Sequence, residues 1–277
     1  MIEARSSGSA IDRDGAAALM EPLTDLVIKA GAAIIAVNRA AMEIEGKVDG
    51  SPVTEADLAS DRIIAEGLAR LVPEWPALSE ERVHIAKPPP YDGSFFLIDP
   101  LDGTKEFVAG RCEFTVNLAL VSNGTPLLGI IGAPALGLIW RGLVGRGAER
   151  LTTDGPVRTT EPIHTRSTPK AGAPWIVAVS RSHGDARTEA FIDGRPGAVR
   201  QMLGSAVKFG RVAEGGADIY PRLAPTGEWD VAAGHAVVTA AGGRITDGRG
   251  AELRFGRSSG GFIVPEFIAW GDPAAAC

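Results

Sequence analysis

The chain has 277 residues, 35 of them glycine and 19 proline, and a formal net charge of −6 at pH 7. With 45% hydrophobic residues, it is long enough for a large core in one domain or two packed lobes. The negative charge argues against a basic surface for nucleic acid polymers, and no apolar run is long enough to span a bilayer.

The ends of the chain carry few signals. Residues 1–15 are polar and charged, unlike a signal peptide, and we expect them to form a disordered extension. The two cysteines, Cys112 and Cys277, form no metal or redox motif. Their spacing favours a protein of the reducing cytoplasm.

Two helices are expected next. Apolar residues recur at helical spacing within 17–44, and a second periodic segment covers 54–71. The run from Thr54 to Asp57 resembles a capping box, so helix capping is the simplest reading of both residues. Glu80 and Glu81 follow, and by composition alone they are a solvated pair of charges.

The central motif begins with an apolar run at 95–98, typical of a buried strand. Pro100 has no N–H to donate, so the strand is expected to stop there. Gly103 allows a tight turn, after which Thr104 begins a short helix.

This turn gathers oxygen atoms. Asp99, Asp102 and the carbonyl of Leu101 are hard ligands beside the amides of Gly103 and Thr104, a combination that suits Mg²⁺ and phosphate. The alternative is an ordinary turn, because Asp and Gly are common in turns for backbone reasons alone.

The rest of the chain alternates strands and helices. The Asn123-Gly124 pair predicts a hairpin within an antiparallel sheet. The polar segment 151–168 is interpreted as a boundary between lobes, and Gly242-Gly243 as a helix end. The strands are expected at 114–121, 127–133, 138–143, 175–179 and 217–223, and the helices at 204–214 and 229–241.

The run Asp99-Pro-Leu-Asp-Gly-Thr104 resembles a signature of the inositol monophosphatase superfamily, which comprises Mg²⁺-dependent, lithium-sensitive phosphatases. Its extension to Phe107, followed by Glu113-Phe-Thr-Val-Asn117, is similar to the CysQ branch of 3′(2′),5′-bisphosphate nucleotidases. Trp229-Asp230-Val-Ala-Ala-Gly234 resembles the second signature of the superfamily. The resemblance runs from about residue 47 to about residue 243.

The resemblance implies a layered α/β/α/β/α sandwich with a largely antiparallel first sheet. It implies an α+β lobe at 16–165 with the main metal site and an α/β lobe at 166–277 with a nucleotide pocket, packed as one unit. Two or three Mg²⁺ ions are implied, with the ligands Glu80, Asp99, the Leu101 carbonyl, Asp102 and Asp230. Capping of the last helix is the alternative reading of Asp230.

The resemblance also implies roles in the reaction. Asp57 and Thr104 would orient and deprotonate water, with Glu80 counted among the catalytic residues. The amides of Gly103 and Thr104 would hold the transferred phosphoryl group. The pocket would be formed by Ser180, His183, Gly204 and Lys208, with Gly204 opening a helix N-terminus and His183 and Lys208 neutralising a second phosphate.

The implied function is hydrolysis of the 3′-phosphate of 3′-phosphoadenosine 5′-phosphate to AMP in sulfur assimilation, with the phosphosulfate as a further substrate. Two alternatives stay open: a sugar phosphatase such as inositol monophosphatase, and a non-catalytic sensor of nucleotides or metals. Gly227 and Ala206-Val207 depart from the usual residues of the branch, and Gly227 predicts a wider pocket. The expected state is a monomer or homodimer, cytoplasmic or peripheral at the inner membrane face.

Overall fold

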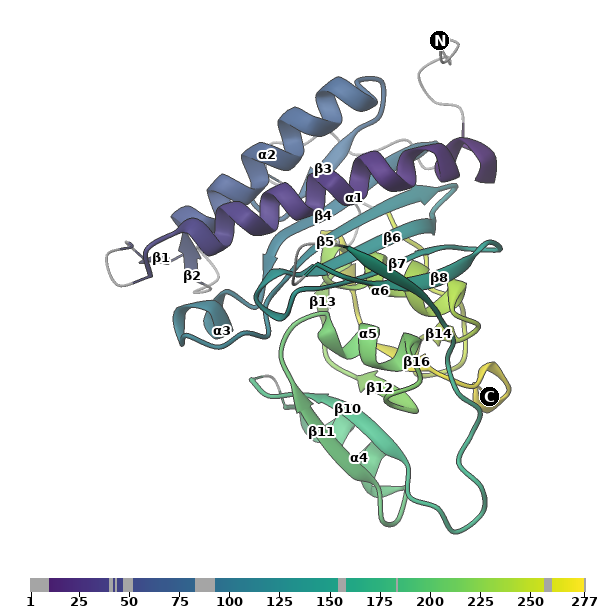
Figure 1. Ribbon diagram of the computed structural model, residues 1–277. Helices are drawn as coiled ribbons and strands as arrows, with labels where there is room; N and C mark the ends of the chain where they lie inside the picture. The colour runs from purple at the N-terminus through teal and green to yellow at the C-terminus, as the bar shows by residue number, and fades with distance from the viewer. Residues whose placement is uncertain are drawn as a thin grey trace.

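The computed structural model describes residues 10–39, 42, 44–46, 52–82, 93–153, 158–182, 184–256 and 261–276. Two large sheets and six α-helices form the fold (Figure 1). Two short strand pairs and two 3₁₀ turns accompany them among the described residues: β1 (Ile44–Gly46) with β2 (Pro52–Thr54), β13 (Thr226–Gly227) with β15 (Ile263–Val264), η1 (Pro134–Leu136) and η3 (Pro273–Ala275).

The first sheet has seven strands in the order β3-β4-β5-β6-β7-β8-β9. Only β3 and β4 run parallel, and all the other neighbours are antiparallel, which confirms the expected character of this sheet. Asn123 and Gly124 both have positive φ, as the predicted hairpin requires. The strands are β3 (Ala77–Ser79), β4 (Ser94–Asp102), β5 (Thr115–Ser122), β6 (Thr125–Ala133), β7 (Leu138–Leu143), β8 (Gly147–Thr152) and β9 (Thr159–Ile163).

The second sheet has five strands in the order β11-β10-β12-β16-β14, and it is mixed. β10 runs parallel to both of its neighbours, whereas β16 runs antiparallel to both of its own. The strands are β10 (Ile176–Ser180), β11 (Val199–Leu203), β12 (Ile219–Arg222), β14 (Arg244–Thr246) and β16 (Phe267–Trp270).

The helices separate into three layers around the two sheets. α1 (Arg13–Ala36) and α2 (Glu55–Leu71) cover one face of the first sheet, and α6 (Glu228–Ala240) covers the other face. α5 (Val207–Ala213) packs beside α6, between the sheets, and α4 (Ala186–Asp193) lies on the outer face of the second sheet. This order confirms the α/β/α/β/α sandwich.

Side-chain alternation in the second sheet shows why both of its faces are covered. Val177 and Val179 of β10 pack with Ile192 of α4, whereas Ala178 between them faces the core shared with α5 and α6. Successive residues of a strand point to opposite faces, so one short apolar strand serves two cores.

α6 approaches the first sheet closely because small residues meet there. A Cβ atom on Gly129 of β6 would lie 2.2 Å from the carbonyl oxygen of Ala233. A Cβ on Gly234 would likewise overlap the ring of Phe209 in α5. The Ala-Ala-Gly run in α6 therefore lets the middle helices and the sheet share one dense core.

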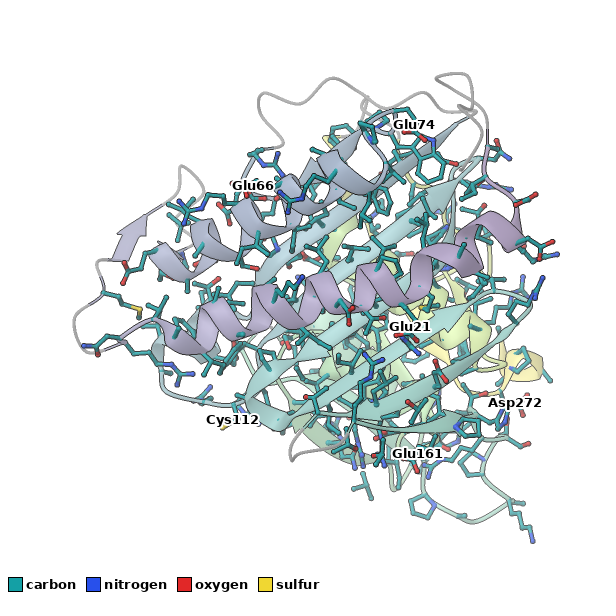
Figure 2. The ribbon with its side chains drawn as sticks, turned by 45° about the horizontal axis from the view of Figure 1, so that its top comes forward. Glu21, Glu66, Glu74, Cys112, Glu161 and Asp272 are labelled. Atoms are coloured by element: carbon teal, nitrogen blue, oxygen red, sulfur yellow. The ribbon has the colours of Figure 1, made fainter. Side chains whose placement is uncertain are left out.

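A buried arginine fastens α1 to the first sheet. Arg141 of β7 is 5% exposed and donates to Glu21 of α1 at 2.6 Å and to Thr24 at 2.9 Å. Glu149 of β8 accepts from the same guanidinium at 2.7 Å. Figure 2 shows α1 lying across the sheet, with Glu21 on the helix. Since removing one partner would leave a buried charge uncompensated, this network fixes the outer layer in register.

The structure corrects the expected ends of the first helix. α1 begins at Arg13, with Asp12 as its N-cap, and it ends at Ala36 rather than at residue 44. Ile11 is buried, and its N–H donates to the Ser94 hydroxyl at 2.9 Å, so residues 10–15 are part of the domain rather than of a disordered extension. Residues 1–9 lie outside the described part of the chain.

The central strand also differs from expectation. β4 continues past Pro100 to Asp102, because the pairing with β5 is irregular between Asp99 and Asp102. Pro100 lies inside that irregularity, where a missing N–H does not break the ladder.

Polar composition concealed several elements. The segment interpreted as a lobe boundary contains the C-terminal end of β8 and all of β9, which is an edge strand with four exposed residues of five. β11 is also an edge strand, and α4 is short and largely polar. Edge strands bury little, so they lack the apolar pattern that predicts a strand.

No helix among the described residues is long and apolar enough to cross a membrane.

The buried His235 of α6 should make the fold sensitive to acid. Its ring lies edge-on to Phe255 and is 8% exposed, and burial lowers its pKa to about 4. An unfolded histidine titrates near 6.5, so stability should be lost as pH falls from 6.5 towards 4.

We expect the wild type to lose about 2 kcal/mol more between pH 7 and pH 5 than the non-titrating His235→Gln variant. Urea unfolding of both proteins at each pH measures this difference. Equal losses would mean that His235 is solvated or already charged in the folded state.

Candidate metal and phosphate site

Strand register brings two acidic residues of the first sheet together. β3 runs parallel to β4 with Ser79 opposite Ile98, so the next residues along the chain are Glu80 and Asp99. The Glu80 amide continues the ladder by donating to the Ile98 carbonyl at 3.1 Å. Two residues 19 positions apart in the sequence thus present their carboxylates at the same sheet edge.

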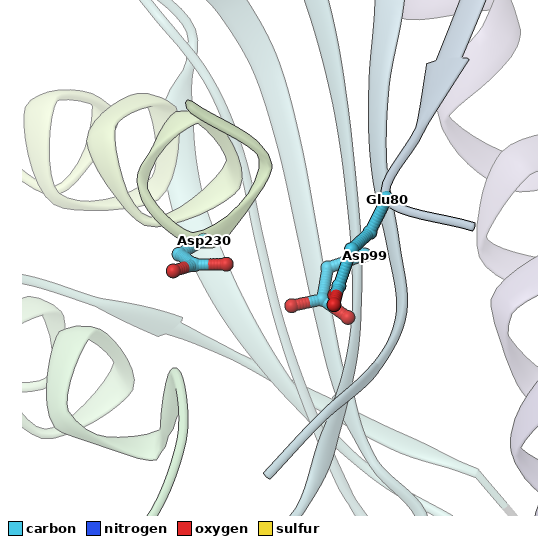
Figure 3. A group of neighbouring side chains, drawn as sticks. All are labelled: Glu80, Asp99 and Asp230. Carbon is cyan, nitrogen blue, oxygen red and sulfur yellow. The ribbon is translucent and has the colours of Figure 1, made fainter. Parts of the chain in front are cut away.

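The third carboxylate comes from the middle layer. Asp230 lies in the first turn of α6, and one carboxylate oxygen from each of Glu80, Asp99 and Asp230 lies within 4.8 Å of the other two. Figure 3 shows Glu80 and Asp99 side by side, with Asp230 facing them from its helix. Asp230 also accepts hydrogen bonds from the Thr226 hydroxyl and from the Gly227 amide. It therefore caps α6 and is also part of the acidic group.

The three carboxylates line a cavity, and Leu101 and Asp102 line it with them. The pairing of Asp102 with Thr115 and of Asp99 with Asn117 puts the Asn117 amide beside Asp102, to which it donates at 3.3 Å. The Leu101 amide donates to Asp99 at 3.1 Å, which holds the bulged segment in shape.

The carboxylates raise one another's pKa values. Burial and the charges of Glu80 and Asp102 hold the pKa of Asp99 well above its usual range. Burial and Asp230 raise the pKa of Asp102 to about 6. Burial also raises the pKa of Asp230, against the hydrogen bond from Thr226. Clustered carboxylates of this kind are costly until a cation neutralises them.

A second group of atoms joins α2 to the turn after β4. The Thr104 hydroxyl lies 3.1 Å from an oxygen of Asp57 and 3.1 Å from the Leu101 carbonyl. The other oxygen of Asp57 accepts from the amide and hydroxyl of Thr54, at 2.8 and 2.7 Å. Asp57 therefore completes the capping box of α2 and reaches Thr104 as well, so the two interpretations do not compete.

Positively charged side chains line the same cavity. Lys208 of α5 is 3% exposed, and its ammonium group lies 5.2 Å from the centre of the Tyr220 ring. Burial lowers the pKa of Lys208 to about 8, although Asp102 opposes the shift. Arg222, at the end of β12, lines the cavity too, and its Nε atom is buried without a hydrogen-bond partner among the described residues.

Sequence reasoning missed Arg222 and Tyr220. Both stand in the expected strand 217–223, but a single arginine or tyrosine in a strand has no distinctive local pattern. The position of Arg222 near the end of the expected strand could have indicated its role, because ligands of α/β folds bind at the carboxyl ends of strands and Arg222 ends β12.

Of the other three residues expected in the pocket, the structure places Ser180 there and Gly204 elsewhere. Ser180 ends β10 and lines the cavity. His183 lies outside the described residues. Gly204 does not open a helix, since α5 begins at Val207, and its amide donates to the Glu113 carboxylate at 3.0 Å. The expectation that Gly204 offers an anion site at a helix start is therefore wrong.

The expectation of a wider pocket at Gly227 fails for a geometric reason. A Cβ atom on Gly227 would lie 2.5 Å from the Trp229 ring, and Gly227 is not among the residues that line the cavity. Its small size accommodates Trp229 rather than a ligand.

A model of the inositol monophosphatase family matches residues 17–271, which include the acidic group and both sequence signatures. The chain belongs to the inositol monophosphatase family.

Relatives and solved structures agree with this membership. The chain is 38% identical over 244 residues to the 3′(2′),5′-bisphosphate nucleotidase CysQ of Escherichia coli K12, covering 86% of this chain and 94% of that protein. It resembles the crystal structure of CysQ from Bacteroides thetaiotaomicron with a TM-score of 0.70 and 32% identity, over 90% of this chain and 96% of that one. It also resembles an inositol monophosphatase of Thermotoga maritima, with a TM-score of 0.72 and 25% identity over 92% of each chain.

The donor set fits the metal dependence that is general in the inositol monophosphatase family. Glu80, Asp99 and Asp230 offer only hard oxygen atoms, the ligands that suit Mg²⁺. The raised pKa values of Asp99 and Asp102 also indicate that the negative charge of the site is not neutralised by the protein alone.

Repulsion among these carboxylates should destabilise the metal-free protein at neutral pH. The folded-state pKa of Asp102, about 6, exceeds its ordinary value of 3.8, so stability is lost as pH rises through that interval. Asp102→Asn should therefore raise the free energy of unfolding in excess chelator by about 1–3 kcal/mol at pH 7.5, and by less than about 1 kcal/mol near pH 4.

Denaturant unfolding of both proteins, with and without Mg²⁺, measures these differences. Mg²⁺ should stabilise the wild type more than the variant, because the variant has lost one negative charge at the site. A variant that is less stable than the wild type at pH 7.5 in chelator would show that the carboxylate of Asp102 is not under repulsion.

Proposed function

We propose that the chain is a Mg²⁺-dependent phosphatase that removes the 3′-phosphate of adenosine 3′,5′-bisphosphate, leaving AMP. The observation that carries this proposal is a cavity lined by both kinds of charge: three carboxylates that face one another, which we call the acidic wall, and the buried Lys208 with the half-buried Arg222, which we call the basic wall. One wall suits a metal-bound phosphate, and the other suits a second phosphate. The acidic wall comes mainly from 16–165 and the basic wall from 166–277, the two lobes that we propose.

Two or three Mg²⁺ ions would be held by Glu80, Asp99, the Leu101 carbonyl, Asp102 and Asp230, which all line the cavity. When bound, the ions supply positive charge that neutralises the carboxylates and the phosphate and favours attack by water.

The residues of the chain itself then prepare the water. The Thr104 hydroxyl donates to Asp57, which leaves its oxygen lone pairs to accept a hydrogen bond from a water molecule. Asp57, held by Thr54, takes up the proton that passes through this pair. Gly103 has a φ of +89°, which turns the chain so that the first amides of α3 (Thr104–Val108) can hold the phosphoryl oxygens.

The basic wall selects the substrate. Lys208 is buried and Arg222 is half-buried, and a phosphate would compensate the charge of both. The similarity to CysQ of Escherichia coli K12 supports the same conclusion, because that enzyme is named for nucleotides that carry two phosphates. The phosphosulfate analogue, with a comparable charge at its 5′ end, is a second substrate within this proposal.

An inositol monophosphatase is the alternative, favoured by the similarity to the Thermotoga maritima enzyme. A substrate with one phosphate would leave the basic wall uncompensated, which argues against it. A non-catalytic sensor would need the acidic and basic walls but would have no use for a hydroxyl–carboxylate contact that can prepare a water, such as that between Thr104 and Asp57.

A phosphate-release assay tests the proposal on one preparation with four substrates: adenosine 3′,5′-bisphosphate, its phosphosulfate analogue, inositol 1-phosphate and fructose 1,6-bisphosphate. We expect the highest kcat/KM with the bisphosphate nucleotide, loss of activity in excess chelator, and inhibition by Li⁺ and Ca²⁺. Faster turnover of inositol 1-phosphate would favour the alternative. Absence of Mg²⁺-dependent release from all four would favour the sensor.

A further inference from the structure

The position of Lys208 depends on the short segment that precedes its helix. Gly204, Ser205 and Ala206 connect β11 to α5, and Ser205 has a φ of +42°, unusual for a residue with a side chain. The ammonium group of Lys208 donates to the Ser205 carbonyl. Where this segment lies therefore decides where the charge of Lys208 lies.

Glu113 holds that segment from the other lobe. It precedes β5, and its carboxylate accepts from the Gly204 amide at 3.0 Å and from Arg181. Arg181 also donates to the Met202 carbonyl at 3.0 Å, so the same ion pair steadies the end of β11. One carboxylate thus holds both the residue that follows β10 and the segment after β11 that leads to Lys208.

The contact is too close for substitution at Gly204. A Cβ atom there would lie 2.4 Å from the Glu113 carbonyl oxygen and 2.9 Å from the Glu113 Cβ. Position 204 therefore needs glycine because the backbone of Glu113 lies against it, and not because a helix begins there as the sequence suggested. A second, weaker tie joins the Thr115 and Ser205 hydroxyls at 3.2 Å.

Neither Glu113 nor Arg181 is among the residues that line the cavity, so neither contacts the substrate there. We infer that Glu113 is a positioning residue for substrate recognition: by holding Gly204 and Ser205 it fixes Lys208 at the distance from the Asp99–Thr104 turn that separates two phosphates. This inference rests on the proposed function, in which Lys208 binds the phosphate that is not cleaved.

A double-mutant cycle between Glu113 and Lys208 tests the inference. Glu113→Ala should lower kcat/KM for adenosine 3′,5′-bisphosphate about 10-fold, mainly through KM, and should have a much smaller effect with inositol 1-phosphate. In the Lys208→Ala background the same substitution should have almost no further effect, because the group that it positions is gone. Glu113→Gln should recover part of the loss, since its side-chain oxygen can still accept from Gly204.

Glu266 offers a matched control. Its carboxylate also accepts from one glycine amide, that of Gly248, and from one arginine, Arg187, but it lines a different groove. The two glutamates are similarly buried, with 22% of the Glu113 side chain and 16% of the Glu266 side chain exposed. Glu266→Ala should lower stability as Glu113→Ala does, but its effect on kcat/KM should be equal for both substrates.

Calorimetric binding of AMP gives a readout that does not depend on turnover. The same cycle should show that Glu113→Ala weakens AMP about 10-fold only while Lys208 is present. Additive effects of the two substitutions would overturn the inference. So would an equal loss of kcat/KM with inositol 1-phosphate, or an affinity for AMP that neither substitution changes. If the wild type releases no phosphate from the bisphosphate nucleotide but the AMP cycle is still coupled, the proposed function fails and the positioning role of Glu113 stands.

Discussion

Asp99→Asn should lower kcat at least on the order of 100-fold with every substrate that the wild type hydrolyses. Asp99 stands at the centre of the acidic group, and its pKa reflects the charges of four neighbouring carboxylates. An amide cannot replace the charge that binds Mg²⁺. It can still accept the hydrogen bond that the Leu101 amide donates to Asp99, so the fold should be preserved.

Phosphate release at saturating Mg²⁺, with circular dichroism and a thermal melt of the same samples, separates lost chemistry from lost structure. Asp25→Asn serves as the control, because that side chain is 61% exposed on α1, away from the cavity. Turnover near that of the wild type in Asp99→Asn would remove Asp99 from the metal site. Loss of the melting transition would show instead that the aspartate holds β4 in shape.

Lys208→Ala should lower kcat/KM for adenosine 3′,5′-bisphosphate about 10- to 100-fold, since a hydrogen bond to a charged group contributes about 1.5–3 kcal/mol. The loss should be much smaller with inositol 1-phosphate, because the metals and the Asp99–Thr104 turn bind the phosphate that is cleaved. The measurement is a comparison of both substrates on one preparation.

Lys208→Met controls for packing. Lys208 is 3% exposed beside Tyr220, and methionine fills similar space without a charge. We expect Met and Ala to be equally harmful with the bisphosphate nucleotide. A methionine variant close to the wild type would assign the effect of alanine to a cavity, and equal losses on both substrates would assign Lys208 to the fold or the metals.

Local features explain what could be predicted. The apolar run before Asp99 and the Pro, Gly and Thr after it determine a strand, a turn and a helix start within a dozen residues, so the turn could be inferred without any tertiary contact. Asp57 and Asp230 were located in the same way, by motif, at the first turns of their helices. Their roles in metal binding and catalysis stay predictions that the variants above test.

Other features depend on partners distant in sequence. The Gly204 segment looked like a helix start, but its amide is bound by Glu113, 91 positions away. Arg222 had no local signature, and only the packing of β12 beside α5 brings it to the cavity. The edge strands β9 and β11 bury too little to be recognised.

The sequence by itself determined the helices and strands with clear apolar periodicity and the two signature motifs, because short-range patterns of turns, caps and apolar residues carry that information. The layered fold and the residues of the acidic wall followed from the family resemblance that those motifs carry. The tertiary structure alone decided that Glu80 lies beside Asp99, that Thr104 contacts Asp57, and that Lys208 and Arg222 line the same cavity. The physical reason is that strand register and helix packing set these distances, and both follow from burial across the whole chain rather than from any one segment.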